Sequence, residues 1–157
     1  MKPCGAAAGE GRRRRGPVRV ALEAMLTSVV LLAGPVLAAA QSSPEAAAQQ
    51  AAENWLQLVD SGQYGLSWDE AAPLFKGAIS RDQWIDAVTG VRRPLGPLKE
   101  RKLQSATRTR TLPGAPDGDY VVLQYESAFA NTQRAVETVT PMRGPDGQWK
   151  VSGYYVR

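Results

Sequence analysis

After residue 43, the first half of the chain carries apolar residues at helical spacing. Ser43 and Pro44 supply a side-chain cap followed by a proline at the first helical position, and Gly62 suits a left-handed stop. The pattern therefore predicts a helix between these points. Its apolar positions recur every three or four residues and share one face: Ala48, Ala51, Ala52, Trp55, Leu58 and Val59.

Two further helices are predicted before the proline-rich stretch at 94–97. The first begins at Ser67, where Glu70 completes a capping box. The second follows Ser80, where Gln83 completes another, and we expect it to end before Pro94.

Beyond residue 98 the apolar period changes from helical spacing to alternation, which is typical of strands. Loops rich in Gly, Pro, Asn and Asp separate four predicted strands, at 99–111, 120–129, 134–142 and 148–156. Helices followed by a strand meander predict an α+β fold. In it, two or three N-terminal helices pack on one side of an antiparallel sheet of about four strands.

An apolar run also precedes the predicted domain. The block Arg12–Arg15 is followed by the run from Val29 to Ala40, which ends in three alanines. This order of basic segment, short apolar core and small residues is the layout of an export signal. We therefore expect residues 1–40 to be a signal peptide and residues 41–157 to form a single exported domain, periplasmic or secreted. An uncleaved membrane anchor is the alternative, and only then do we expect contact with a membrane.

The predicted leader accounts for the basic charge of the chain. There are 19 Lys and Arg residues against 15 Asp and Glu, but six of the basic and two of the acidic groups lie in residues 1–40. The remaining 117 residues carry 13 of each, so we expect no nucleic-acid partner. The only cysteine is Cys4, and the chain has no histidine. Residues 41–157 thus lack the groups for Ser-His-Asp or Cys-His catalysis and for cysteine- or histidine-based zinc sites, and we expect no cofactor and no metal.

With these elements placed, the chain resembles the bacterial domain of unknown function family numbered 4019. The resemblance implies an exported small domain and supplies no activity. It is carried by ordered motifs over residues 45–157: Ala51-Ala52-Glu53-Asn54-Trp55-Leu56, Val59-Asp60-Ser61-Gly62, Ser67-Trp68, Ala72-Pro73-Leu74-Phe75, Ser80-Arg81-Asp82-Gln83-Trp84, Arg93-Pro94-Leu95-Gly96, Leu112-Pro113-Gly114, Tyr120-Val121-Val122-Leu123-Gln124-Tyr125 and Gly147-Gln148-Trp149-Lys150-Val151-Ser152-Gly153-Tyr154-Tyr155.

The helix order and the closing strand are also similar to cone-shaped folds of the nuclear transport factor 2-like and cystatin-like kind. That likeness implies a curved sheet that wraps a long helix and often leaves a pocket. It concerns the fold, and fold alone does not establish function. The catalytic residues of the ketosteroid-isomerase branch have no counterparts by motif in this chain.

Four aromatic side chains are candidates for the walls of a ligand site: Trp55, Trp84, Tyr125 and Trp149. Each also lies where its helix or strand is expected to face the core, and a buried aromatic contributes a large apolar area. The sequence favours core packing over ligand binding for these residues.

Five basic residues lie close together where the last helix meets the first strand: Arg92, Arg93, Lys99, Arg101 and Lys102. They form a candidate patch for an anionic partner. Arginines at a helix end also interact favourably with the helix dipole, and basic residues on an edge strand discourage aggregation. The structural explanation is favoured here as well.

Two pairs of acids have spacings that invite a catalytic reading. Asp82 and Asp86 share a helix face, and Glu126 and Glu137 lie on either side of a predicted hairpin turn. A solvated surface explains the first pair better, and no dyad is assigned to the second because its register is not fixed by sequence.

These features favour an exported, non-catalytic binding or interaction module. Its partner is unknown, with a small apolar ligand or an envelope component as candidates. One alternative is a small pocket enzyme that uses a carboxylate for proton transfer or hydrolysis, which requires a buried acid with a raised pKa. Another is an envelope accessory that binds an anionic surface through the basic residues, with binding that weakens in salt.

Overall fold

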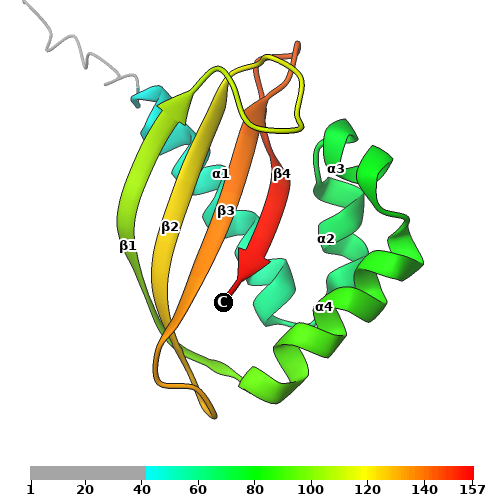
Figure 1. The fold of residues 1–157 in the computed structure, drawn as a ribbon, viewed down its shortest axis with the longest axis vertical. Helices are drawn as coiled ribbons and strands as arrows, with labels where there is room; N and C mark the ends of the chain where they lie inside the picture. The colour runs from blue at the N-terminus through cyan, green and yellow to red at the C-terminus, as the bar shows by residue number, and fades with distance from the viewer. Residues whose placement is uncertain (1–41) are drawn as a thin grey trace, which may run out of the picture. The chain divides into compact units, whose positions relative to one another are not determined.

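The computed structural model describes residues 42–157, which form four helices and one four-stranded sheet (Figure 1). The predicted signal peptide, residues 1–40, lies outside the described residues. The helices are α1 (Pro44–Asp60), α2 (Tyr64–Glu70), α3 (Pro73–Ala78) and α4 (Arg81–Leu95). The strands are β1 (Leu98–Thr109), β2 (Tyr120–Phe129), β3 (Ala135–Arg143) and β4 (Trp149–Val156). The predicted α+β class is confirmed.

The sheet is an antiparallel meander in the order β1-β2-β3-β4, so β1 and β4 are its two edges. In the register Tyr125 of β2 faces Glu137 of β3, and Thr138 faces Tyr155 of β4. A bulge interrupts the β3–β4 pairing between Thr140 and Pro141. This register places the buried residues Ala135, Glu137 and Val139 of β3 opposite buried residues of β2.

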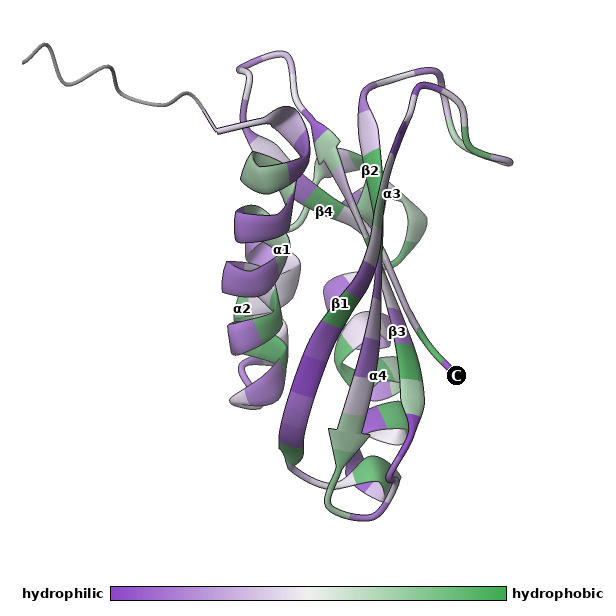
Figure 2. Cartoon of the chain, turned by 90° about the vertical axis from the view of Figure 1, so that its left-hand side faces the viewer, coloured by the Kyte–Doolittle hydropathy of each residue, from purple (hydrophilic) through white to green (hydrophobic). Residues whose placement is uncertain are grey.

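Helix α1 lies across one face of the sheet and contacts all four strands (Figure 1). The core between them is apolar, with Ala52, Leu56 and Val59 of α1 packed against Leu123 and Val139 of the sheet. The outer face of α1 and most of β1 are hydrophilic (Figure 2). Helices α2 and α4 pack on each other, and α3 contacts β4, so these three helices lie towards the β4 side of the domain.

The helices differ from the sequence prediction at three points. Two or three helices were predicted and residues 42–157 form four, because α2 and α3 replace the single helix expected from Ser67. Helix α2 begins at Tyr64, so Ser67 lies inside it instead of capping it. The Ser67 hydroxyl donates to the carbonyl of Tyr64 (2.8 Å) and accepts from the indole N–H of Trp84 (3.0 Å). A tertiary hydrogen bond therefore uses the side chain that the local pattern assigned to a cap.

The end of α4 also differs. Its predicted capping box is present, with Ser80 and Gln83 bonded in both directions. The helix continues through Pro94 to Leu95, where Gly96 with φ of 78° ends it. Pro94 lacks an N–H, but the carbonyl of Pro94 accepts from the side-chain amide of Asn131 (3.1 Å). The last turn is thus held by the β2–β3 loop.

Candidate functional site

The interior of the fold contains one acidic side chain, Glu137 of β3, which is fully buried. Its Oε1 accepts from Tyr154 (2.6 Å) and from Nη1 of Arg92 (3.1 Å). Its Oε2 accepts from Nε of Arg101 (2.6 Å) and from the hydroxyl of Ser127 (2.5 Å). A carboxylate offers about four lone-pair sites, so all of its acceptor capacity is taken by protein donors.

The two arginines are joined a second time by Asp60 at the end of α1. Arg92 donates to its Oδ1 (2.6 Å), and Arg101 donates to Oδ2 (2.7 Å) and Oδ1 (3.0 Å). Two cations and two anions thus form a neutral cluster, in which Arg92 also lies over the ring of Phe129, 4.5 Å from its centroid. We call Asp60, Arg92, Arg101, Ser127, Glu137 and Tyr154 the buried ion cluster. Arg92, Ser127 and Glu137 are its buried centre, and Asp60 is its exposed end.

The cluster shifts the pKa of two of its members. Burial lowers the pKa of Arg101, but hydrogen bonds and charge interactions with Asp60 and Glu137 outweigh it, so the pKa is raised overall. Burial raises the pKa of Tyr154, and the charge of Glu137 beside it raises that pKa further. Arg101 therefore stays a cation and Tyr154 stays a neutral donor throughout the physiological range.

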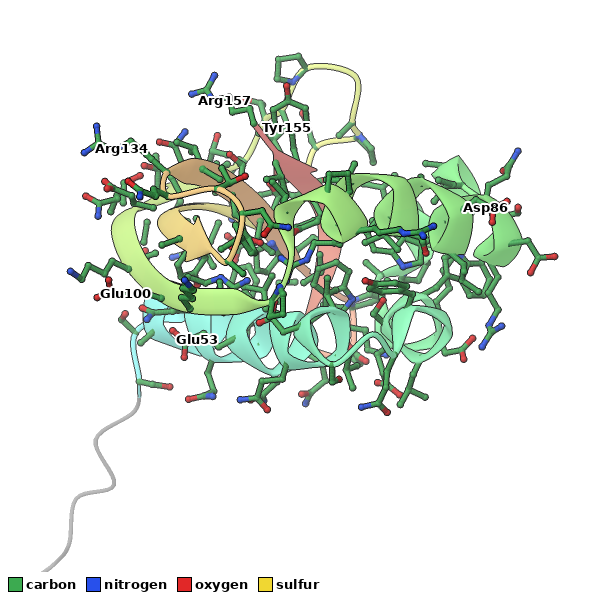
Figure 3. The ribbon with its side chains drawn as sticks, turned by 90° about the horizontal axis from the view of Figure 1, so that it is seen from below. Glu53, Asp86, Glu100, Arg134, Tyr155 and Arg157 are labelled. Carbon is green, nitrogen blue, oxygen red and sulfur yellow. The ribbon has the colours of Figure 1, made fainter. Side chains whose placement is uncertain are left out.

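This arrangement does not suit acid–base catalysis. A general base needs a free lone pair within reach of a substrate proton, and every oxygen site of Glu137 already has a donor. Asp82 and Asp86 are exposed, and Asp86 points away from the sheet (Figure 3). Glu126 faces Val136 in the register and pairs with exposed Arg134, so it does not approach Glu137.

Sequence reasoning did not assemble this cluster, although one signal was available. In β3 the buried positions alternate as Ala135, Glu137, Val139 and Pro141. A carboxylate in the inward phase of an otherwise apolar strand requires a buried partner. The partners lie 45 and 36 residues away along the chain, in Arg92 and Arg101, so the strand pattern could not identify them.

The predicted basic patch is divided by the fold. Arg92 is buried and Arg101 is mostly buried, and both point into the ion cluster. Arg93, Lys99 and Lys102 are exposed, and Lys102 pairs with Glu100 (3.0 Å). An anionic-partner surface at this junction is therefore limited to the three exposed residues.

The structure brings together two of the four aromatic ligand candidates. The rings of Trp55 and Trp84 lie 5.7 Å apart, and both contact Phe75 and Tyr154. Both indoles are buried and donate hydrogen bonds, from Trp55 to the carbonyl of Ser67 (2.7 Å) and from Trp84 to its hydroxyl (3.0 Å). This aromatic cluster packs α1, α2 and α4 together.

The other two candidates lie elsewhere. Tyr125 is buried beneath α1, and its hydroxyl is a buried polar atom without a hydrogen-bond partner. Burial raises the pKa of this hydroxyl, and the charge of Glu53 adds to the rise. Trp149 is half-buried at the start of β4.

An apolar groove of about 310 Å³ lies between α4 and the end of β4. Two of its residues are among the few large apolar side chains left exposed, Val91 at 45% and Tyr155 at 61%. Tyr154 lines the groove, and its hydroxyl donates to Glu137. One residue therefore belongs both to the groove wall and to the ion cluster. Its main walls are Trp84, Ala87, Val88 and Val91 of α4 and residues 154–156 of β4, and no carboxylate lines it.

The outer edge of β4 has no strand partner along this groove. Arg157 exchanges both backbone hydrogen bonds with Val136 of β3 (2.8 and 3.1 Å). Backbone groups alternate in direction along an antiparallel strand, so the N–H and C=O groups of Tyr154 and Val156 point away from β3. Within residues 42–157 no other strand lies on that edge.

The earlier part of the same edge is covered. The N–H of Ala72, just before α3, donates to the carbonyl of Val151 (2.8 Å). The open stretch of the β4 edge is therefore short and coincides with the apolar groove.

Among residues 42–157, no helix has the length and apolar character to cross a membrane. The same part of the chain gathers no group of three or more acidic, histidine or cysteine side chains that could hold a metal ion.

A family model described as "Protein of unknown function (DUF4019)" matches residues 51–154. The chain belongs to this family. The resemblance drawn from the sequence motifs is thereby confirmed. The DUF4019 match includes all six residues of the buried ion cluster and ends at Tyr154, within the stretch of β4 that lines the groove.

No curated protein sequence matches this DUF4019 chain. A solved structure from Catenulispora acidiphila is similar at 16% sequence identity, over 71% of this chain and 88% of that chain, with a TM-score of 0.43. A likeness this distant carries no information about function.

Proposed function

We propose that this DUF4019 domain is a non-catalytic binding module that holds an extended peptide segment of a partner protein in the α4–β4 groove. The peptide would add to the sheet as a further strand next to β4. The observation that carries the proposal is the coincidence of an unpaired strand edge with an exposed apolar groove.

The geometry supplies both parts of this kind of recognition. Main-chain groups of Tyr154 and Val156 are directed outward and can pair with a peptide backbone, which gives affinity without sequence preference. The apolar walls at Val88 and Val91 accept every second side chain of the added strand, which gives specificity. Helix α4 would flank the added strand on its other side.

The alternative of a pocket enzyme has weaker support. It needs an acid that meets a substrate, whereas the groove has no carboxylate wall and the buried acid Glu137 is saturated by four donors. The sequence-predicted export signal supports a partner in the periplasm or outside the cell.

The proposal is tested by panning a phage-displayed library of random peptides against the purified protein and a Val91→Asp variant. We expect the wild type to select peptides with apolar residues at alternate positions and Val91→Asp to lose them, because a carboxylate in the groove would have to be desolvated. Leu66→Asp is the matched control, since Leu66 is also helical and also 45% exposed but does not line the groove.

Hydrogen exchange then locates the bound peptide. The amides of Tyr154 and Val156 should become protected when a selected peptide binds. Equal binding by Val91→Asp, or protection confined to β1 at the other edge, would refute the proposal.

A further inference from the structure

Trp149 differs from the other three tryptophans of the chain in how its indole N–H is used. Trp55 and Trp84 donate to Ser67, and Trp68 donates to the carbonyl of Ile79 (2.9 Å). Within residues 42–157 the indole N–H of Trp149 has no such acceptor, although its ring packs against the core and is half-buried, as that of Trp68 is. Three indole N–H groups are thus used within the fold, and the N–H of Trp149 is left for a ligand.

Trp149 lies in a furrow between α1 and the β3–β4 hairpin. The furrow comprises two adjoining hollows of about 390 and 370 Å³. Both hollows are lined by the same four residues, Ala51, Asn54, Gln148 and Trp149, so the indole stands at the point where they meet. This site lies at the start of β4, whereas the peptide groove lies at its end.

The remaining walls carry side-chain amides together with three charged residues, Arg143 in one hollow and Glu70 and Lys150 in the other. Gln50 and Asn54 project from α1, and the amide of Gln50 donates to Oδ1 of Asn54 (3.1 Å). That bond leaves the NH₂ group of Asn54 and the carbonyl oxygen of Gln50 free to bind a ligand, and Gln148 adds a third amide across the furrow. Each amide offers both donors and an acceptor without carrying charge.

We infer that this furrow is a saccharide-binding site, with a pyranose ring stacked on Trp149. The C–H face of a sugar ring is apolar and matches the flat indole, while its rim of hydroxyls both donates and accepts hydrogen bonds and so matches neutral amides. Two hollows on either side of the indole fit neighbouring sugar units of a chain. The inference is independent of the peptide groove.

The four indole N–H groups provide a direct test by NMR of the protein labelled with ¹⁵N-tryptophan. Chitohexaose and maltohexaose are titrated separately to millimolar concentration. The comparison tells whether the site prefers a chain of N-acetylated sugars or a chain of unmodified glucose units. We expect one of the two to shift the Trp149 signal, assigned by its loss in Trp149→Phe, while the signals of Trp55, Trp68 and Trp84 stay in place.

A Trp149 variant could lose binding because it fails to fold, so a second variant is needed. Asn54→Ala keeps the indole and removes one amide at an exposed helix position, where the fold should tolerate it. It should weaken binding at least tenfold. Gln57→Ala, on the same helix and also exposed but outside the furrow, should bind as the wild type does. The site is refuted if neither saccharide moves the Trp149 signal, or if the shift survives unchanged in Asn54→Ala.

Discussion

At the scale of single residues, the most consequential side chain is Glu137. Its burial is tolerated because two guanidinium groups and two hydroxyls replace the water that an ionised carboxylate requires. The same saturation that stabilises the anion removes it from chemistry with a substrate. Glu137 is therefore best understood as a structural anion.

Glu137→Gln is expected to lower the free energy of unfolding by about 3–5 kcal/mol, because it leaves two buried cations facing a neutral amide. The amide NH₂ must also face at least one hydrogen-bond donor, whichever way it is turned. Urea unfolding followed by tryptophan fluorescence measures the loss. Glu126→Gln, at an exposed pair on the adjacent strand, should cost under about 1 kcal/mol. Equal costs for the two variants would contradict the role of Glu137.

At the scale of elements, α4 passes to β1 through a connection of two residues, Gly96 and Pro97. Gly96 has φ of 78° and ψ of −174°, a region open essentially to glycine alone. A Cβ built on it would lie 3.1 Å from both the Cβ of Ala130 and the amide nitrogen of Asn131. This glycine therefore lets α4 end directly against the β2–β3 loop.

Gly96→Ala is expected to destabilise the protein by about 2–4 kcal/mol, through backbone strain together with displacement of the loop. Gly114→Ala is the matched control, because its φ is 76° but a Cβ there meets nothing within 4 Å. It should cost about 1–2 kcal/mol, from the left-handed conformation alone. Thermal unfolding of both variants decides the matter, and equal losses would show that the close approach at Gly96 is unimportant.

At the scale of the whole molecule, the buried ion cluster joins six elements. Asp60 comes from α1, Arg92 from α4, Arg101 from β1, Ser127 from β2, Glu137 from β3 and Tyr154 from β4. The cluster therefore fixes α4 relative to the sheet, and with it the width of the apolar groove. Arginine suits this role because its planar group can hold both carboxylates at once.

Arg101→Lys should loosen the whole assembly, because the bonds to Asp60 and Glu137 come from three different guanidinium nitrogens and lysine has one nitrogen to replace them. We expect faster hydrogen exchange at the end of α1, in β1 and in α4 together, measured by mass spectrometry on peptides from each. Arg108→Lys makes the same change at the exposed pair with Asp119, and its effect should stay within β1 and β2. A response to Arg101→Lys confined to β1 would mean that the cluster does not couple the elements.

The sequence by itself determined the elements of this protein. Helical spacing, the caps at Ser43 and Ser80, and the alternation beyond residue 98 are local properties, so they predicted α1, α4 and the four strands to within a few residues. They failed where a distant contact competed, as at Ser67, whose hydroxyl accepts from Trp84 instead of capping a helix. The cone-shaped comparison, the export signal and the exported location remain predictions.

Only the tertiary structure decided what the polar and aromatic residues do. The sequence placed Arg92 and Arg101 in a surface patch, whereas in the structure both pair with Glu137. Their counterions lie 32 to 45 residues away along the chain, so the local pattern could not show the pairing. Trp149 was expected in the core, and the fold packs it against the core while part of it lines a furrow. Short-range patterns predict backbone conformation because its energy depends on neighbouring residues. Burial and ion pairing depend instead on which surfaces meet when the chain folds.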